Sequence, residues 1–233
     1  MLQTPKKVLI FAAHQDDETI GCGGTIKKWS DLGTEVTVVF FTNGDTGIDQ
    51  KAEYTSDSIV ATRMEEANKA KEILGIHNVY TFDIPCQCVE NNQETFHKTI
   101  AAIRMEKPEI ILTHAPHDKH RDHRIISEIV KEACWKAYED IHPELGPTHR
   151  IKDLWAFEIS DLLPRVDFVV DVSSSAMKAK LKAFNAYHSQ LGVIHGLVRH
   201  IRGSSVVRGY MIGANHGEAY MRINTSPMSL RKR

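Results

Sequence analysis

Residues 8–18 read Val-Leu-Ile-Phe-Ala-Ala-His-Gln-Asp-Asp-Glu, an apolar run followed directly by a polar motif. Its first five residues form a continuous apolar run, which is typical of a strand buried on both faces of a parallel sheet. His14 and the acids at 16–18 would then lie at the end of that strand. Neighbouring carboxylates repel one another unless a cation or a proton relieves them, so the stretch predicts a cation site.

Residues 110–124 repeat the pattern as Ile-Ile-Leu-Thr followed by His-Ala-Pro-His-Asp-Lys-His-Arg-Asp-His-Arg. Because ligand-binding residues gather at the carboxyl edge of a doubly wound sheet, we expect the two polar bursts to meet there. Three protein ligands plus one water are the usual arrangement of a catalytic zinc site. Within the second burst we expect His120 and His123 to act at the site, and His114 and His117 to lie behind the ligands or at the surface.

Strand-like and helix-like patterns alternate along the chain. Strands are predicted at residues 8–12, 36–42, 78–84, 109–113, 154–159 and 166–172. Helices are predicted around residues 23–32, 60–74, 94–105 and 125–133, and a last one through 177–187 is capped by Ser173. This order predicts an α/β protein with a Rossmann-like, doubly wound, mostly parallel sheet and helices on both faces.

The length and net charge of the chain limit the classes of function that it can have. The 233 residues are predicted to form a single domain, with residues 226–233 as a frayed basic tail. With 29 basic and 30 acidic residues the net charge is -1, which does not favour nucleic acid or a membrane as partner. No apolar run approaches the roughly 20 residues of a membrane span, and the start carries no secretion signal, so a cytoplasmic location is expected. The four scattered cysteines are expected to be reduced thiols.

The motif at residues 14–18 and the His-Arg-Asp-His motif at 120–123 resemble those of the LmbE-like, or PIG-L-like, zinc-dependent N-deacetylases, which carry His-Pro-Asp-Asp-Glu and His-x-Asp-His. The resemblance extends to residues 63–67, 189–190, 202–203 and 217–220. There are two departures. Gln15 stands where the family usually has proline, and His216 stands where many members have a tyrosine that helps to bind the reacting amide.

The resemblance implies that His14, Asp17 and His123 bind the metal and that Asp16 is the general base. The local sequence alone leaves open which of Asp16 and Asp17 faces the metal, and the family pattern makes that choice. The implied metal is Zn²⁺, although imidazole and carboxylate ligands also suit Fe²⁺ or another divalent ion. The implied reaction is attack by a zinc-activated water on an amide carbonyl, with Asp16 accepting the proton.

The same pattern implies that His120 stabilises the developing oxyanion and that Asp122 supports its charged form. Either Asp16 or His120 would return a proton to the leaving amine. Arg63 is expected near the carboxyl edge, where it would bind a sugar hydroxyl or an anion, and His216 is a second candidate for substrate binding.

The substrate class that the resemblance implies is an N-acetylated amino sugar or its glycoside, and a homo-oligomer is compatible with relatives that assemble. Loops 43–57 and 142–150 are expected to shape the pocket rim. The motifs also suggest three alternative functions. A dinucleotide site fails because Ile26 stands where a third glycine is needed, whereas a metal-dependent phosphoesterase and a non-catalytic metal-binding module stay open.

Overall fold

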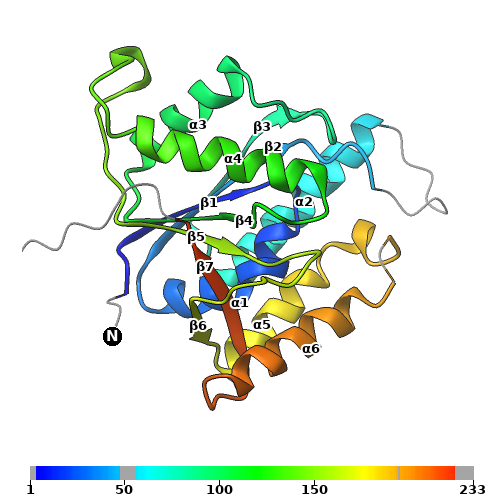
Figure 1. Cartoon of the computed structure of the whole chain (residues 1–233). Helices are drawn as coiled ribbons and strands as arrows, with labels where there is room; N and C mark the ends of the chain where they lie inside the picture. Colours follow the sequence, from blue (N-terminus) through cyan, green and yellow to red (C-terminus); the bar gives the residue numbers. More distant parts are fainter. Residues whose placement is uncertain (1–3, 48–55, 194, 224–233) are drawn as a thin grey trace, which may run out of the picture.

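A computed structural model describes residues 4–47, 56–193 and 195–223 (Figure 1). Its strands are β1 Lys7–Ala12, β2 Glu35–Thr42, β3 Asn78–Ile84, β4 Ile110–His114, β5 Asp153–Phe157, β6 Phe168–Asp171 and β7 Gly217–Arg222. Its α-helices are α1 Asp17–Asp31, α2 Ser56–Leu74, α3 Gln93–Glu106, α4 Arg121–Lys136, α5 Ser174–Phe184 and α6 Leu197–Tyr210. Short 3-10 helices cover Pro143–Leu145 and His188–Gln190. The predicted tail at 226–233 and part of the predicted loop 43–57 lie outside the described residues.

All of these strands belong to one seven-stranded sheet with the order β3-β2-β1-β4-β5-β7-β6. The pairs among β3, β2, β1, β4 and β5 are parallel, whereas β7 runs antiparallel to β5 and β6. The predicted fold class, a mostly parallel α/β sheet, is therefore confirmed. The strand order reverses between β1 and β4, and such a switch point is where ligands bind in doubly wound sheets.

Helices cover both faces of the sheet (Figure 1). On one face α1, α2 and α5 pack on one another, and on the other face α3 packs on α4. Side chains of β1 alternate between the two cores: Ile10 joins the first and Phe11 the second. Because both faces are buried, the strand reads as an unbroken apolar run, and β1 is held rigidly in the middle of the molecule.

Helix α1 begins at Asp17, six residues before the predicted start, and is kinked at Cys22. After the kink, the backbone N–H groups of Gly24 and Thr25 donate to the Glu218 carboxylate at 2.8 and 2.7 Å. A Cβ on Gly24 would lie 2.6 Å from Val172 Cγ1, so only glycine allows this approach. The glycines after the first motif thus serve close packing of α1 rather than phosphate binding.

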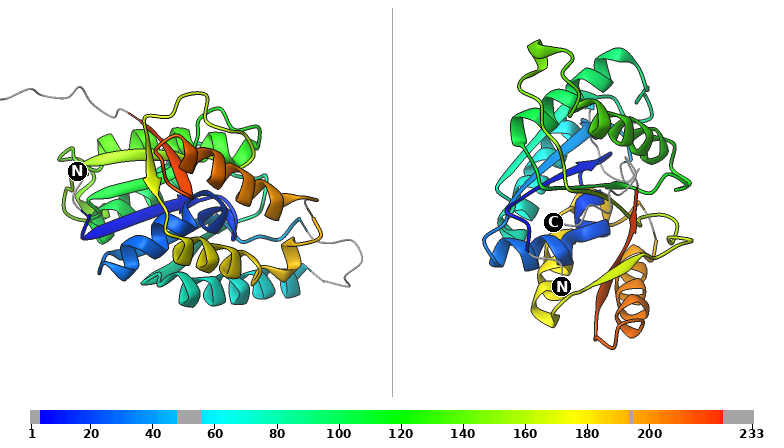
Figure 2. Two further views of the ribbon diagram at one scale, coloured as in Figure 1. Left: turned by 90° about the horizontal axis from the view of Figure 1, so that it is seen from below. Right: turned by 60° about the vertical axis from the view of Figure 1, so that its left-hand side comes forward.

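The C-terminal part differs most from the sequence prediction. Helix α6 and strand β7 were not predicted, and β7 inserts between β5 and β6. Figure 2 shows α6 (orange) lying along β7 (red) at this side of the sheet. Ser173 caps α5 as predicted, accepting the Ala176 N–H at 3.1 Å. Within the described part of the chain, we find no helix with the length and apolar character that a bilayer crossing requires.

Candidate active site

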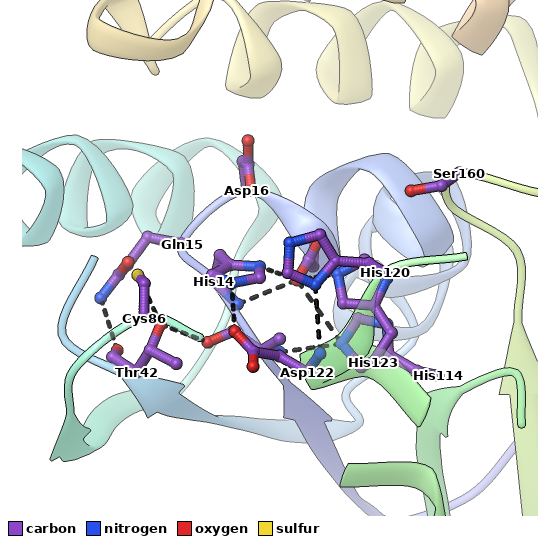
Figure 3. A network of polar contacts seen from close by, with 12 residues as sticks. His14, Gln15, Asp16, Thr42, Cys86, His114, His120, Asp122, His123 and Ser160 are labelled. Carbon is purple, nitrogen blue, oxygen red and sulfur yellow. Dashed lines mark hydrogen bonds and ion pairs between the residues drawn. The ribbon is translucent and has the colours of Figure 1, made fainter. Parts of the chain in front are cut away.

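The two polar motifs meet at the switch point of the sheet. His14 follows β1, and His120 and His123 begin α4, which follows the neighbouring strand β4. In Figure 3 the side chains of His14, His120, Asp122 and His123 converge above the ends of these strands. The parallel pairing of β1 with β4 therefore brings together residues that are about a hundred positions apart in the sequence.

The Asp17 carboxylate lies at the centre of the cluster. Its Oδ2 is 3.2 Å from His14 Nδ1 and 3.3 Å from His123 Nε2. Ligands about 2.0–2.1 Å from a tetrahedral zinc ion are about 3.3 Å apart, so these spacings match a shared metal. Ligand atoms of His14, His120 and His123 also lie within 4.8 Å of one another. His123 Nε2 is a buried nitrogen with no hydrogen-bond partner among the described residues, as expected of a ligand atom.

His114 lies behind this cluster, as predicted, and His117 is exposed. His114 Nε2 is 3.5 Å from Asp17 Oδ2, but it accepts the Ala13 N–H at 2.8 Å. Its lone pair is therefore already engaged. Burial and the neighbouring charge of His123 lower the pKa of His114 well below its usual value, so this histidine is neutral. Two groups of side chains among the described residues could hold a divalent metal: His14 with His120 and His123, and Asp17 with His114 and His123.

Charge is balanced within the cluster. Although burial would lower the pKa of His123, the Asp17 and Asp118 carboxylates raise it to about 9. Burial would likewise raise the pKa of Asp17, but His123 and His114 hold it well below its usual value. The carboxylate of Asp17 thus stays ionised and attracts positive charge from several directions, which is the electrostatic requirement for binding a cation.

Asp118 supports His123 and was missed by the sequence analysis. Its Oδ1 lies 3.1 Å from His123 Nδ1 and accepts the His120 N–H at 2.8 Å, while its Oδ2 accepts the Ser160 N–H at 3.0 Å. A carboxylate on the far nitrogen of a ligating histidine fixes the ring and its tautomer. The signal was present, since Asp118 is an acid within the second histidine-rich burst.

Asp122 is placed differently from the expectation. Its Oδ2 lies 3.1 Å from His14 Nε2 and accepts the Gln87 N–H at 2.9 Å. The contact of Asp122 with the His120 ring is instead through its backbone N–H, which donates to His120 Nδ1 at 3.2 Å. Through this hydrogen bond, His120 caps α4. Because the His120 ring is bonded to the backbone of Asp122, the Asp122 carboxylate is free to orient His14. Burial and the charges of His123 and His14 lower the pKa of His120.

Asp16 points away from the ligand cluster (Figure 3) and lines the adjoining cleft. Its φ of 135° is a strained conformation for a residue with a side chain, and strain of this kind gathers at functional sites. Burial, with a smaller contribution from the Asp17 charge, raises the pKa of Asp16 to about 7 against the opposing charge of Arg63. A carboxylate with a pKa near neutrality is suited to accept and return a proton.

Arg63 lies beside Asp16, with its Nη2 3.7 Å from Asp16 Oδ1. Its guanidinium donates to the carbonyls of Gln15 at 2.8 Å and Thr46 at 3.1 Å, and it is 3% exposed. Glu66, three residues further along the same helix, does not pair with Arg63 and instead accepts the Ser189 N–H and hydroxyl at 2.9 and 2.7 Å. Arg63 is thereby fixed at the cleft wall, where it was predicted.

The cleft beside the cluster has a volume of about 390 Å³. Besides Asp16, Arg63 and the metal cluster, it is lined by residues that the sequence analysis did not single out for binding: Ile20, Thr46, Gly47, Gln87, Lys119, Ile159, Ser160, Gln190, His195, Gly196, Leu197 and His200. Thr46 and Gly47 belong to the predicted rim loop 43–57. Most of the others come from loops and from α6, whose position depends on the tertiary fold.

His216 and loop 142–150, which were expected at the substrate cleft, lie away from it. His216 does not line the cleft; its Nδ1 is 3.3 Å from Ser205 Oγ on α6. This differs from the expectation, because His216 is packed on α6 just before β7 pairs with β6. Loop 142–150 also lies away from the cleft: the carbonyls of His142 and Gly146 accept hydrogen bonds from Arg104, which anchors the loop to α3.

The chain is therefore a doubly wound α/β protein with a cluster of histidines and aspartates at the switch point that could hold a metal ion. The family model for PIG-L, GlcNAc-PI de-N-acetylase, matches residues 9–134. This chain belongs to the PIG-L family. The matched residues include both polar motifs, so the resemblance to this family inferred from the sequence is confirmed.

Individual relatives are similar over most of the chain. A diacetylchitobiose deacetylase of Thermococcus kodakarensis is 30% identical over 194 residues, covering 79% of this chain and 70% of the relative. The solved structure of N,N'-diacetylchitobiose deacetylase from Pyrococcus horikoshii, complexed with its inhibitor MPG, has a TM-score of 0.85 at 25% identity, covering 95% of this chain and 85% of that one. A 4-oxalmesaconate hydratase of Pseudomonas putida is 30% identical over 138 residues, covering 57% of this chain and 53% of the relative.

Proposed function

We propose that the protein is a zinc-dependent deacetylase that removes the acetyl group from an N-acetylated amino sugar or its glycoside, in the cytoplasm. The observation that carries this proposal is the arrangement of a metal-binding cluster and a separate carboxylate of raised pKa on the same cleft. His14, Asp17 and His123 would hold the metal, and Asp16 lies next to them on the cleft wall. Membership of the PIG-L family and the deacetylase names of the relatives support the proposal.

A zinc ion held by these residues would supply Lewis acidity and would lower the pKa of a water toward ~7. Asp16 then acts as general base and takes a proton from the attacking water. Its pKa of about 7 suits this role, because a weaker base would not accept the proton and a stronger one would not release it. The strained backbone at Asp16 directs its carboxylate into the cleft rather than toward the metal ligands.

His120 is suited to stabilise the negative charge that develops on the amide oxygen. Its Nδ1 accepts the Asp122 N–H, so in the neutral ring the proton is on Nε2. The Nε2–H can donate to the oxygen even when the ring is uncharged, which agrees with the lowered pKa of His120. Asp122 would orient the ligand His14 instead of supporting a charged His120.

The leaving amine needs a proton, and both Asp16 and His120 line the cleft where it would depart. Asp16 holds a proton after the attack step, and His120 carries one on Nε2. Arg63, fixed by two backbone carbonyls, would position the sugar through a hydroxyl or an anionic substituent.

The test is to purify the protein, measure its zinc content and assay acetate release from N-acetylglucosamine and its glycosides before and after chelation. We expect close to one zinc per chain, loss of acetate release on chelation, and recovery when zinc is restored. Unchanged acetate release in the chelated protein would overturn the metal-dependent mechanism. Metal binding without turnover of any substrate would favour a binding module.

A second candidate is the addition of water to a carbon–carbon double bond, since one relative of 30% identity is named a hydratase. The same cluster and base could activate water for that reaction. The sequence match spans about half of the hydratase, against 70% of the deacetylase. An assay with an unsaturated polycarboxylate, followed by loss of ultraviolet absorbance, separates the two activities, and a phosphate ester tests for phosphoesterase activity.

A further inference from the structure

Asp16 has a backbone conformation that its own residue type does not favour. A residue with a Cβ atom rarely adopts its φ of 135°. Asp16 is also the N-cap residue of α1, yet its side chain makes no capping hydrogen bond, and the carboxylate lines the cleft instead (Figure 3). An aspartate at a helix start is normally stabilised by such a cap. Contacts made by other residues must therefore hold Asp16 in place.

The peptide group between Gln15 and Asp16 is held at both ends. Its carbonyl, on Gln15, accepts a hydrogen bond from Arg63 Nη2 at 2.8 Å, and its N–H, on Asp16, donates to Glu18 Oε2 at 3.2 Å. Because the φ angle of Asp16 is measured from this peptide plane, fixing the plane opposes relaxation to a less strained φ. Glu18 is 1% exposed and does not line the cleft, so it holds the peptide group without touching a substrate.

The Glu18 carboxylate is itself held by two hydroxyl groups. The Tyr187 hydroxyl donates to Glu18 Oε1 at 2.7 Å, and the Thr19 hydroxyl donates to the same oxygen. Tyr187 lies in the turn after α5 and is fully buried. Among the described residues no lysine or arginine pairs with Glu18, although burial of a carboxyl group without a cation lowers stability. The backbone that Glu18 holds explains this buried acid better than the stability of the fold does.

We infer that Glu18 and Tyr187 are positioning residues: through the Asp16 N–H they hold the Asp16 carboxylate where it accepts a proton from water. The inference rests on the proposed deacetylase function, in which Asp16 is the general base, and it gives a role to the last acid of the first motif. A chain of hydrogen bonds leads from the Tyr187 hydroxyl through the Glu18 carboxylate to the Asp16 N–H. When this chain is broken, the strained backbone relaxes and the base moves away from its working position.

Two buried tyrosines provide a matched test. Tyr187→Phe removes the hydroxyl that holds Glu18, whereas Tyr220→Phe removes a hydroxyl that donates to Thr25 Oγ1 at 2.7 Å, further along the same helix α1. Both side chains are fully buried, so the two variants should lose similar amounts of stability. With the N-acetylglucosamine substrate that the parent protein hydrolyses best, Tyr187→Phe should lower kcat about threefold to tenfold with little change in KM. Tyr220→Phe should leave both constants unchanged, and equal kcat values in the two variants would overturn the inference.

Substitutions of Glu18 test the carboxylate itself. In Glu18→Gln the amide oxygen can still accept the Asp16 N–H while its NH₂ group donates to the two hydroxyls, so kcat should stay within about threefold of the parent value. Glu18→Leu leaves the Asp16 N–H without an acceptor and should lower kcat about 10–100-fold, with bound zinc retained. Loss of zinc in Glu18→Leu, or a Glu18→Gln protein as slow as Glu18→Leu, would overturn the inference. If Glu18→Leu does not fold, the two tyrosine variants decide the question.

A double substitution separates an effect through Asp16 from a general loss of structure. In an Asp16→Asn background the base is already absent, so adding Tyr187→Phe should cause no further fall in kcat. A further fall as large as that in the parent background would show that Tyr187 acts elsewhere, and would overturn the inference. If the parent protein releases no acetate from any N-acetylated amino sugar, the proposed function itself fails. If the parent protein is active and the two tyrosine variants are equal, only the positioning role fails.

Discussion

Two buried arginines lie in very different surroundings. Arg104, in the last turn of α3, is 1% exposed and donates to the carbonyls of six residues at the end of α4 and in the loop that follows: Ala137, His142, Gly146, Lys136, Glu139 and Ile141. Arg63, on α2, is 3% exposed and donates to two carbonyls, while its Nε has no partner in the described part of the chain. The first is saturated by the fold, whereas the second lines the cleft beside Asp16.

The comparison shows how one residue type divides between stability and function. The carbonyl groups around Arg104 compensate the charge of its guanidinium, and these hydrogen bonds hold the end of α4 against α3. Arg63 lies beside Asp16 at the open carboxyl edge, where the substrate would enter. We therefore expect substitutions of Arg104 to lower the free energy of unfolding and substitutions of Arg63 to lower enzymatic activity.

The largest effect is expected at the active-site end, for Asp16→Asn. Removing the general base should reduce kcat by about 10²–10⁴-fold. Asparagine tolerates the positive φ of this position, so the fold should persist. Steady-state kinetics, zinc content and thermal unfolding measure the three properties. The exposed Asp31→Asn, at the end of α1, serves as control and should change none of them. Near-normal turnover in Asp16→Asn would remove this residue from the role of base.

Next comes Arg104→Met at the opposite region. The variant leaves several buried carbonyls without donors, and we expect it to lower the free energy of unfolding by about 3 kcal/mol. Urea denaturation measures this change, with the exposed Arg202→Met on α6 as matched control. The kcat of the protein that remains folded should stay close to that of the parent. A loss of kcat without loss of stability would contradict the division between the two regions.

The sequence predicted the parts of the molecule that local patterns encode. The run of apolar residues at β1 and the motif after it located the metal cluster, because a strand end places adjacent side chains regardless of the rest of the chain. The mostly parallel sheet followed from the alternation of strands and helices, whereas the pairing of β1 with β4 was seen only in the structure. These features depend on periodicity and on short-range order.

What could not be predicted depends on distant packing. Strand β7 carries Glu218 and Arg222 among its six residues, and these charges hid its strand pattern. Both are paired in the fold: Glu218 with Lys180 at 2.6 Å, and Arg222 with Asp153 at 2.8 Å. The position of α6 also depends on contacts with distant parts of the chain, so the sequence did not predict that this helix lines the cleft. The position of His216 outside the cleft has the same cause.

A smaller effect is expected for Asp118→Asn, which tests whether the carboxylate behind His123 supports metal binding. The variant keeps the shape of the side chain but removes the charge that faces His123 Nδ1. Loss of such a carboxylate typically lowers metal affinity about 10–100-fold, and we expect the same here. Competition with a chelator of known affinity measures the change. An unchanged zinc affinity would mean that Asp118 serves only to cap the loop through the N–H groups of His120 and Ser160.

The smallest effect, and the sharpest test of the comparison, is expected for the pair Arg63→Lys and Arg104→Lys. Lysine keeps the charge at each position but lacks the planar fork that donates in several directions. At Arg63 this should lower kcat/KM by about tenfold, with a smaller loss of unfolding free energy than at Arg104, because two carbonyls rather than six lose donors. At Arg104 the order should reverse, with stability falling and kcat/KM preserved. If Arg63→Lys instead unfolds as readily as Arg104→Lys, Arg63 serves the stability of the fold rather than substrate binding.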